Sequence, residues 1–438
     1  MPNPSASIPC DEIEGRYFWL YHEKLALDLG GYFETEFWTH LISRECHHEP
    51  AVRHAVFALT ALYKSTESRI YTTKANDKHL DFALVHQSKA IVSLRKTLSN
   101  GPPNMRLALI ASLLFGCFES FQGNWETAIQ QIYSGQNILK CLQGGKSGKV
   151  AESLSTIEPE LGLTLRRLKL QTLSFLAMSP MCKHPFTDSE DEELMEDMVD
   201  GFTTQKEAFT LATSLATRVF LYLRRSARST DVERLPVTRQ RDCLIRSVEQ
   251  WSKAYEPIFL EAFSKMDRRQ FLLALQLRIY SWSFEIMVFT SLSKEEIIFD
   301  KFTGRFRQII FSSRCLLKKD QEIGGSDGLR AQGSTGLIMT LFYTATRCRD
   351  FFVRREAIAL LREWPCMNGI WHSLQAANVA AWIVSIEEKD CNSATFVPEE
   401  HRVRMNSLRM AFKDGRMTIE CMQGTVDGGL ELRKSDLL

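Results

Sequence analysis

The sequence lacks the closely spaced cysteine pairs from which proteins build zinc clusters. Its 11 cysteines are scattered, and even the nearest two, Cys348 and Cys366, are widely separated. A thiolate cluster needs several cysteines that converge on one metal, usually through Cys-x-x-Cys pairs, so we expect none here. The odd number and the wide spacing favour reduced thiols, as in a cytosolic or nuclear protein.

The sequence also lacks an excess of either charge. Its 54 Lys and Arg residues nearly balance its 53 Asp and Glu residues. No global electrostatic field should therefore attract nucleic-acid phosphates or anionic lipids, and any nucleic-acid contact would have to be local. The N-terminal stretch has neither a basic segment nor an apolar run, and the apolar windows near 107–118 and 271–289 are short or interrupted by charge. We expect neither a secretory signal nor a transmembrane span.

Sustained period-two alternation of apolar residues is scarce, whereas helical spacing recurs along the chain. With 44% hydrophobic and 24% charged residues, the composition is that of a soluble globular protein. We therefore predict an all-α fold, an irregular multi-helix array or bundle of helical hairpins in a single large domain. Two amphipathic helices should meet at Glu49-Pro50, and a hairpin should turn at Gln122-Gly123, with Asn124 as the N-cap of its second helix.

Further helices are predicted at 78–98, 104–121, 158–178, 204–225, 237–265, 268–292, 294–318, 337–352, 355–363, 369–388 and 399–422. The glycine-rich breaks at 144–148 and 324–336 are too short to separate independent domains. The expected organisation is a disordered N-terminus over 1–14, one helical domain over 15–423 and a flexible tail over 424–438.

Three motifs occur in a consistent order along residues 15–405. The first is EPAVRHAVFALTAL, from Glu49 to Leu62. The second is FGCFESFQGNWETAIQQIYSGQNIL at 115–139, with Cys117 before the Q-G-N turn and Gly135 near its end. The third is AIALLREWPCMNGIWHSLQAANVAAWIVSIEE at 357–388. Together they resemble the regulatory (fungal-specific transcription factor) domain of fungal binuclear zinc-cluster transcription factors.

The resemblance implies a helical regulatory domain in a nuclear or nucleocytoplasmic protein. Its partners would be a DNA-bound transcription factor or coregulator, with a small apolar ligand and a homodimer as further possibilities. The six-cysteine DNA-binding motif of that family usually precedes this region. The likeness already begins at RYFWLYHEK, from Arg16, so only about a dozen residues precede the first match here. We therefore expect no direct sequence-specific DNA contact.

Each segment that could carry chemistry has a simpler structural explanation. The glycine-rich loop GGKSGKV at 144–150 has the wrong spacing for a phosphate loop. The acidic stretch at 188–200, which includes TDSEDEE, has no companion magnesium motif and is typical of a solvated loop. The basic segment at 218–228 could support nuclear import or acidic-partner docking, but cations at a helix end are common.

Histidines and aromatic residues leave two further candidates. His40, His47, His48 and His54 lie near Cys46, but Pro50 interrupts any common helical face, and Arg53 and His54 are better explained by structural hydrogen bonds. An apolar stripe could line a ligand pocket, although core packing also accounts for it: Phe271, Tyr280, Trp282, Phe284, Met287 and Phe289. We expect no catalytic, cofactor, metal or DNA-binding residues, and the residues of a ligand pocket stay unassigned.

The functional hypothesis is a regulator of fungal transcription that acts through protein partners rather than through its own zinc cluster. Two alternatives stay open. One is a repurposed helical scaffold that acts as an enzyme or carrier in a specialised-metabolite pathway. The other is a shortened gene product of an ordinary zinc-cluster factor, with the six-cysteine segment encoded upstream.

Overall fold

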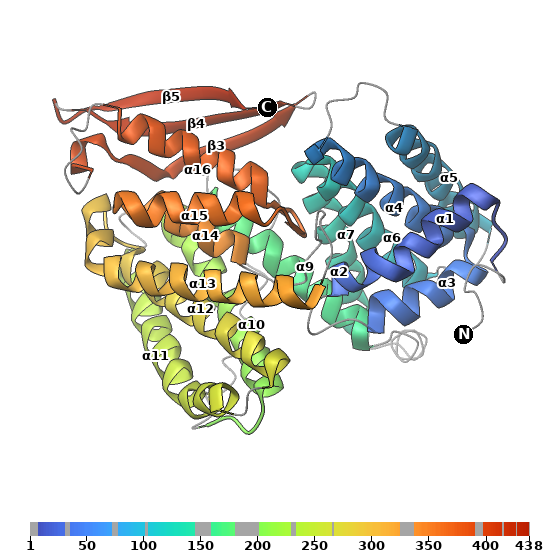
Figure 1. Cartoon of the computed structure of the whole chain (residues 1–438), viewed down its shortest axis with the longest axis horizontal. Helices are drawn as coiled ribbons and strands as arrows, with labels where there is room; N and C mark the ends of the chain where they lie inside the picture. The colour runs from blue at the N-terminus through green and yellow to red at the C-terminus, as the bar shows by residue number, and fades with distance from the viewer. Residues whose placement is uncertain are drawn as a thin grey trace. The chain divides into compact units, whose positions relative to one another are not determined.

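The computed structural model describes residues 8–30, 36–71, 78–100, 104–144, 159–179, 201–228, 234–264, 267–324, 337–389, 397–413, 416–425 and 427–437. The predicted all-α class is confirmed, because the described residues are mainly helical (Figure 1). The chain divides into two compact units. Unit 1 holds the described residues before Leu173 together with Cys366–Ile370, and unit 2 holds the other described residues.

Unit 1 is built of helices that follow one another at short intervals. They are α1 (Glu12–Leu20), the π-helix η2 (Tyr21–Leu25), α2 (Ala26–Gly30), the π-helix η3 (Phe37–Leu41), α3 (Ile42–His48), α4 (Pro50–Tyr71), α5 (Lys78–Asn100), α6 (Met105–Gln122), α7 (Trp125–Gly144) and the first part of α9 (Pro159–Met178). The predicted junction at Glu49-Pro50 is confirmed: Glu49 is extended and Pro50 begins α4. Proline suits that position because its missing N–H would have had no helical partner.

The first described residues are ordered by a capping box. Asp11 accepts a hydrogen bond from the Glu14 N–H, and the Glu14 carboxylate accepts one from the Asp11 N–H. Helix α1 therefore begins at Glu12. The prediction of disorder over 1–14 is wrong for residues 8–14, because the reciprocal bonds satisfy the donors of the first turn; residues 1–7 lie outside the described part.

The α6–α7 hairpin turns at Gly123, whose φ of 79° lies in the left-handed region that glycine tolerates. Asn124 directly precedes α7, as predicted, but its side chain points back to the preceding helix. The Asn124 amide donates to Glu119 at 2.8 Å and to Gln122 at 3.0 Å. Side chains at the end of α6 therefore bind Asn124 and stabilise the turn of the hairpin.

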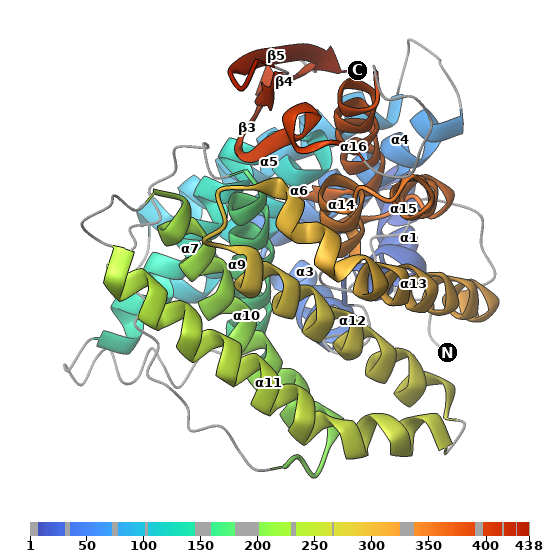
Figure 2. The same ribbon diagram turned by 90° about the vertical axis from the view of Figure 1, so that its left-hand side faces the viewer.

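Unit 2 surrounds a central helix, α12 (Arg268–Thr290), with α10 (Gln205–Arg228), α11 (Arg234–Ser264), α13 (Thr303–Gly324) and α14 (Leu337–Arg347). Figure 2 shows α10, α11 and α12 side by side. Buried residues occur on all sides of α12, from Leu272 to Val288, which is the pattern of a core helix.

The remaining elements of unit 2 are the 3₁₀-helix η5 (Glu296–Phe302), α15 (Phe351–Glu363), β2 (Trp371–His372), α16 (Ser373–Glu387), the 3₁₀-helix η6 (Glu399–His401) and the strands β3 (Val403–Lys413), β4 (Arg416–Gly424) and β5 (Leu430–Leu437). Strand β1 (Met367–Asn368) falls within unit 1. Several predicted helix boundaries change. The prediction of a helix over 294–318 is split by η5, the one over 337–352 ends at Arg347, and the one over 369–388 begins at Ser373.

The end of α14 shows why such boundaries shift. Asp350 accepts hydrogen bonds from the Phe352 and Val353 N–H groups and so starts α15 at Phe351. A side chain that caps the next helix competes with continuation of the previous one.

The predicted helix over 399–422 is wrong, and so is the predicted flexible tail over 424–438 where the structure describes it. Strands β3, β4 and β5 instead form an antiparallel sheet in the order β3-β4-β5. Along β4, Met417, Ile419 and Cys421 are buried and alternate with more exposed residues, which is the period of a half-buried strand. Exposed β5 is held by backbone pairing with β4, from Met417–Leu437 to Gly424–Leu430.

Among the described residues, two helices are long and apolar enough to cross a membrane, whereas we expected these windows to be too short or interrupted by charge. They are Met105–Gln122 and the window Gln270–Thr290 within α12. Their windows are 72% and 83% buried inside the protein, respectively, which is what core helices of a soluble fold also show. Length and composition alone therefore do not assign either helix to a membrane.

Candidate functional site

Unit 2 contains a cavity of about 560 Å³. Its walls come from the ends of α9, α10 and α12, from η5 and α14, and from all three strands of the sheet. The apolar part includes Met178, Leu223, Met287, Phe299 and Met405. A volume in this range suits a small organic molecule.

A bulge in β3 shapes the wall of the cavity. The pairing of β3 with β4 shifts register between Arg404 and Arg409, and the residues in this interval include Met405, Asn406 and Ser407, which line the cavity. The Ser407 hydroxyl accepts a hydrogen bond from the Met422 N–H at 2.7 Å, which replaces a missing ladder bond. Bulges of this kind redirect side chains out of the regular sheet pattern.

One side of the cavity carries a buried ion pair. The Arg347 guanidinium donates to both carboxylate oxygens of Glu296, at 2.6 and 2.7 Å, and Arg349 lies 3.3 Å from the same carboxylate. Burial raises the pKa of Glu296, but the two arginines outweigh that effect and hold it below its ordinary value. Glu296 is therefore ionised and already neutralised by protein groups.

The ion pair continues into a second buried cluster behind the cavity. The Glu387 carboxylate accepts from Arg349 at 2.9 Å, from Arg354 at 2.6 Å and from the Val403 N–H at 2.7 Å. The side chains of Glu387, Arg349 and Arg354 are fully buried. One carboxylate thus joins α15, α16 and β3.

The lining of the cavity provides neutral and charged polar groups beside its apolar residues. The described residues that line the cavity include no His, Cys or Asp, so no nucleophile has a histidine base beside it. Burial raises the pKa of the Tyr343 phenol to about 12, which keeps it neutral. Hydroxyl groups such as Ser291, which is hydrogen-bonded to Tyr222 at 2.8 Å, provide neutral polar positions.

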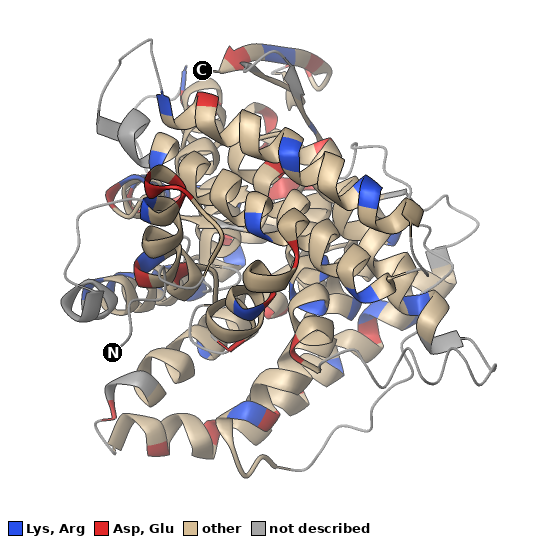
Figure 3. Cartoon of the chain, turned by 90° about the vertical axis from the view of Figure 1, so that its right-hand side faces the viewer, with Lys and Arg blue, Asp and Glu red and all other residues tan. Residues whose placement is uncertain are grey.

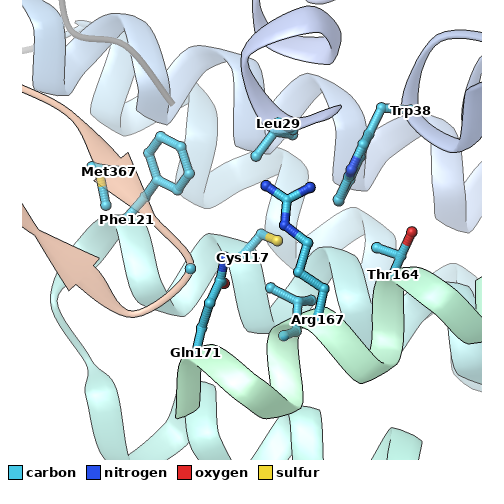
Figure 4. A pocket seen from close by; sticks show the side chains of 10 residues that line it. Leu29, Trp38, Cys117, Phe121, Thr164, Arg167, Gln171 and Met367 are labelled. Carbon is cyan, nitrogen blue, oxygen red and sulfur yellow. The ribbon is translucent and has the colours of Figure 1, made fainter. Parts of the chain in front are cut away.

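Unit 1 contains a much smaller pocket, of about 30 Å³, which has room for little more than one water molecule. Figure 4 shows Arg167 and Gln171 extending from α9 towards Cys117 and Leu29. Arg167 donates to the Gly30 carbonyl at 3.1 Å. Burial raises the pKa of the Cys117 thiol to about 12, so it is not a reactive thiolate.

The structure gives His54 a partner outside the histidine cluster near Cys46. His54 on α4 contacts His86 on α5, with their Nδ1 atoms 3.2 Å apart. Glu14 on α1 completes a group whose ligand-type atoms all lie within 4.8 Å of one another. Arg53 donates to the Cys46 carbonyl at 3.0 Å, which confirms its predicted structural bond.

The partners of His54 are 32 and 40 residues away in sequence, so no local spacing marks them. Burial, followed by the nearby Lys89, lowers the pKa of His86 to about 4, and burial likewise lowers that of His54. Both rings are therefore neutral at pH 7.

The other segments considered from the sequence contribute few residues to the cavity. Of the aromatic and methionine stripe, Met287 lines the cavity, Tyr280 and Phe284 are buried, and Phe289 is half exposed. In the basic segment, Arg224 is buried and cannot present its charge to an import receptor. The loop residues 145–150 and the acidic stretch 188–200 lie outside the described part. Acidic and basic residues are interspersed along the described helices (Figure 3).

Comparison with known proteins identifies no matching protein family, no matching curated protein and no matching solved structure. The fold and the cavity therefore define the class of protein, a mainly helical protein with a ligand-sized cavity, without assigning it to a family.

Proposed function

We propose that this protein is a regulator of transcription whose helical body binds a small ligand and acts through protein partners. The cavity of about 560 Å³ is the observation that carries the proposal. Its lining offers apolar and polar groups in similar measure, including Lys294, Glu295 and Arg404, without a recognisable catalytic arrangement among the described lining residues. These are properties of a sensing site.

The sequence motifs supply the regulatory part of the proposal. They resemble the regulatory domain of fungal zinc-cluster factors, and the sequence contains no six-cysteine motif. The protein would therefore reach promoters in a complex with a DNA-bound factor or coregulator in the nucleus. The ligand would be small and would combine an apolar part, to pack against methionines such as Met287 and Met405, with polar groups to match Ser293 and Asn406.

A cavity-blocking variant tests the proposal. Ala227 is exposed at the end of α10 and lines the cavity, so Ala227→Trp places a large ring at its edge. Ala411→Trp is the matched control, because Ala411 is exposed on β3 and does not line the cavity. Each form would be returned to a deletion strain for transcript profiling and chromatin immunoprecipitation.

We expect the wild type and Ala411→Trp to occupy promoters and restore transcripts, and Ala227→Trp to leave transcripts near the deletion level. Unchanged transcripts in the deletion strain together with no promoter enrichment would contradict the proposal. An accumulated pathway intermediate with normal transcripts would favour an enzyme or carrier instead.

A further inference from the structure

Three helices of unit 1 bring together a set of metal-ligand side chains far from the cavity residues in sequence. Helix α4 packs against both α1 and α5. Glu14 comes from α1, His54 from α4 and His86 from α5, and one ligand atom of each lies within 4.8 Å of the others. Two imidazoles and a carboxylate are a common donor set for zinc and similar divalent metals.

The two histidines already have the spacing that a metal needs. Their Nδ1 atoms are 3.2 Å apart. Nitrogen ligands lie about 2.0–2.1 Å from zinc, so two of them in a tetrahedral arrangement are about 3.3 Å from each other. A metal ion can therefore be placed between these rings with little movement of either helix.

Glu14 is oriented by the start of its own helix. Its Oε2 atom accepts the Asp11 N–H at 3.0 Å as part of the capping box, and its Oε1 atom lies 3.7 Å from the His86 Nε2 atom. The capping bond thus directs the other oxygen towards the histidines. The His86 nitrogen nearest Glu14 is Nε2 whereas the one nearest His54 is Nδ1, so a shared ion requires the His86 ring and the carboxylate to turn towards each other.

His86 is held by aromatic neighbours. The Phe82 ring stacks on it with centroids 4.1 Å apart, and Phe57 meets it at 5.6 Å in a T-shaped contact. His86 is buried, whereas His54 and Glu14 are partly exposed. The group is therefore rigid on its inner side and accessible from its outer side, as a metal site with an entry path requires.

We propose that Glu14, His54 and His86 bind one divalent metal ion of the zinc type. These three side chains leave a fourth tetrahedral position for water on the accessible side. The bound ion would fasten α1 to α4 and α5, because each helix contributes one ligand. A simple hydrogen bond between the two histidines is the competing explanation of their short separation.

Metal binding by the full chain separates the two explanations. After removal of metals with a chelator, zinc would be titrated in a calorimeter, and cobalt would be added for absorption spectroscopy. We expect one zinc per chain and the visible bands of tetrahedral cobalt without a thiolate charge-transfer band. A strong thiolate band would assign the metal to cysteines and overturn the proposal.

Conservative variants identify the ligands. Glu14→Gln keeps a residue that can complete the capping box, and His54→Gln changes a partly exposed side chain, so both variants should fold. Each should weaken zinc binding by about tenfold or more. The matched controls Glu12→Gln and His48→Gln change exposed residues outside the group and should bind like the wild type.

Circular dichroism and thermal melting would verify the fold of each variant. Absence of stoichiometric zinc binding to the wild type, or affinities of Glu14→Gln and His54→Gln equal to those of the controls, would establish the hydrogen-bonded pair instead.

Discussion

Gly135 shows how a single residue sets the distance between helices in unit 1. It lies on α7, and a Cβ atom built at this position would be 2.5 Å from the Ser112 Oγ atom and 3.0 Å from the Leu165 Cδ2 atom. Both distances are shorter than ordinary packing contacts. The glycine is therefore required by close packing of α7 against α6 and α9, and its place in the second motif has a structural reason.

Gly135→Ala should lower the free energy of unfolding by about 1–3 kcal/mol, because the added methyl group overpacks this contact. Gly162→Ala is the matched comparison. Gly162 lies in α9 with open space around its Cα atom, so alanine should raise the free energy of unfolding by about 0.5–1 kcal/mol through helix propensity. Urea denaturation followed by circular dichroism measures both. Equal effects of the two substitutions would contradict the packing argument.

At the scale of elements, the buried cluster around Glu387 joins two helices and the sheet of unit 2. Burial raises the pKa of Glu387, but Arg349, Arg354 and the Val403 N–H outweigh it and hold the pKa below its ordinary value. The carboxylate is thus charged and balances two buried guanidinium groups. Loss of its charge would leave those groups without adequate compensation.

Glu387→Gln should lower the free energy of unfolding by about 3–5 kcal/mol, the range found when one partner of a buried ion pair is removed. The control is Glu431→Gln on exposed β5, where the ion pair with Arg433 is solvated and the expected change is below about 0.5 kcal/mol. Guanidinium denaturation would measure the free energy of unfolding of both variants and of the wild type. A loss of less than about 1 kcal/mol for Glu387→Gln would mean that the arginines find other partners.

Elements differ in how well local sequence predicts them. The helix start at Pro50 and the turn at Gly123 follow from backbone chemistry confined to a few residues, and both were predictable. The strands were not, because β3 is bulged and β5 is exposed, so neither shows clear alternation. Their pairing depends on β4 lying between them, which is a tertiary arrangement.

At the scale of the whole molecule, titration of histidines links pH to stability in both units. Burial lowers the pKa of His22 in unit 1, and burial lowers that of His372 in unit 2 from 6.5 to about 4. The unfolded chain takes up these protons at about pH 6.5, before the folded chain does. Stability is therefore greatest above pH 6.5 and falls as the pH approaches 4.

His372 provides a direct test of this pH dependence. Its Nδ1 atom accepts the Leu374 N–H at 3.2 Å and caps α16, which requires the neutral ring. His372→Asn preserves a capping acceptor and removes the titration, so it should flatten the fall in stability between pH 6.5 and 4 by about 1–2 kcal/mol. The full pKa shift of His372 would imply a larger change in stability, but the side chain is partly exposed and solvent weakens the effect.

Thermal melting across this pH range would measure the effect, with His48→Asn as the exposed control. The same pH slope in His372→Asn and in the wild type would show that His372 does not contribute.

The sequence alone determined that the chain is mainly helical, because the spacing of apolar residues and the chemistry of turns act within a few positions. Only the tertiary structure decided the sheet, the cavity and the grouping of Glu14, His54 and His86. Those features join residues tens to hundreds of positions apart, as when Ala177 and Leu430 line one cavity. Local periodicity carries no information about which distant faces meet, since that is settled by packing of the whole chain.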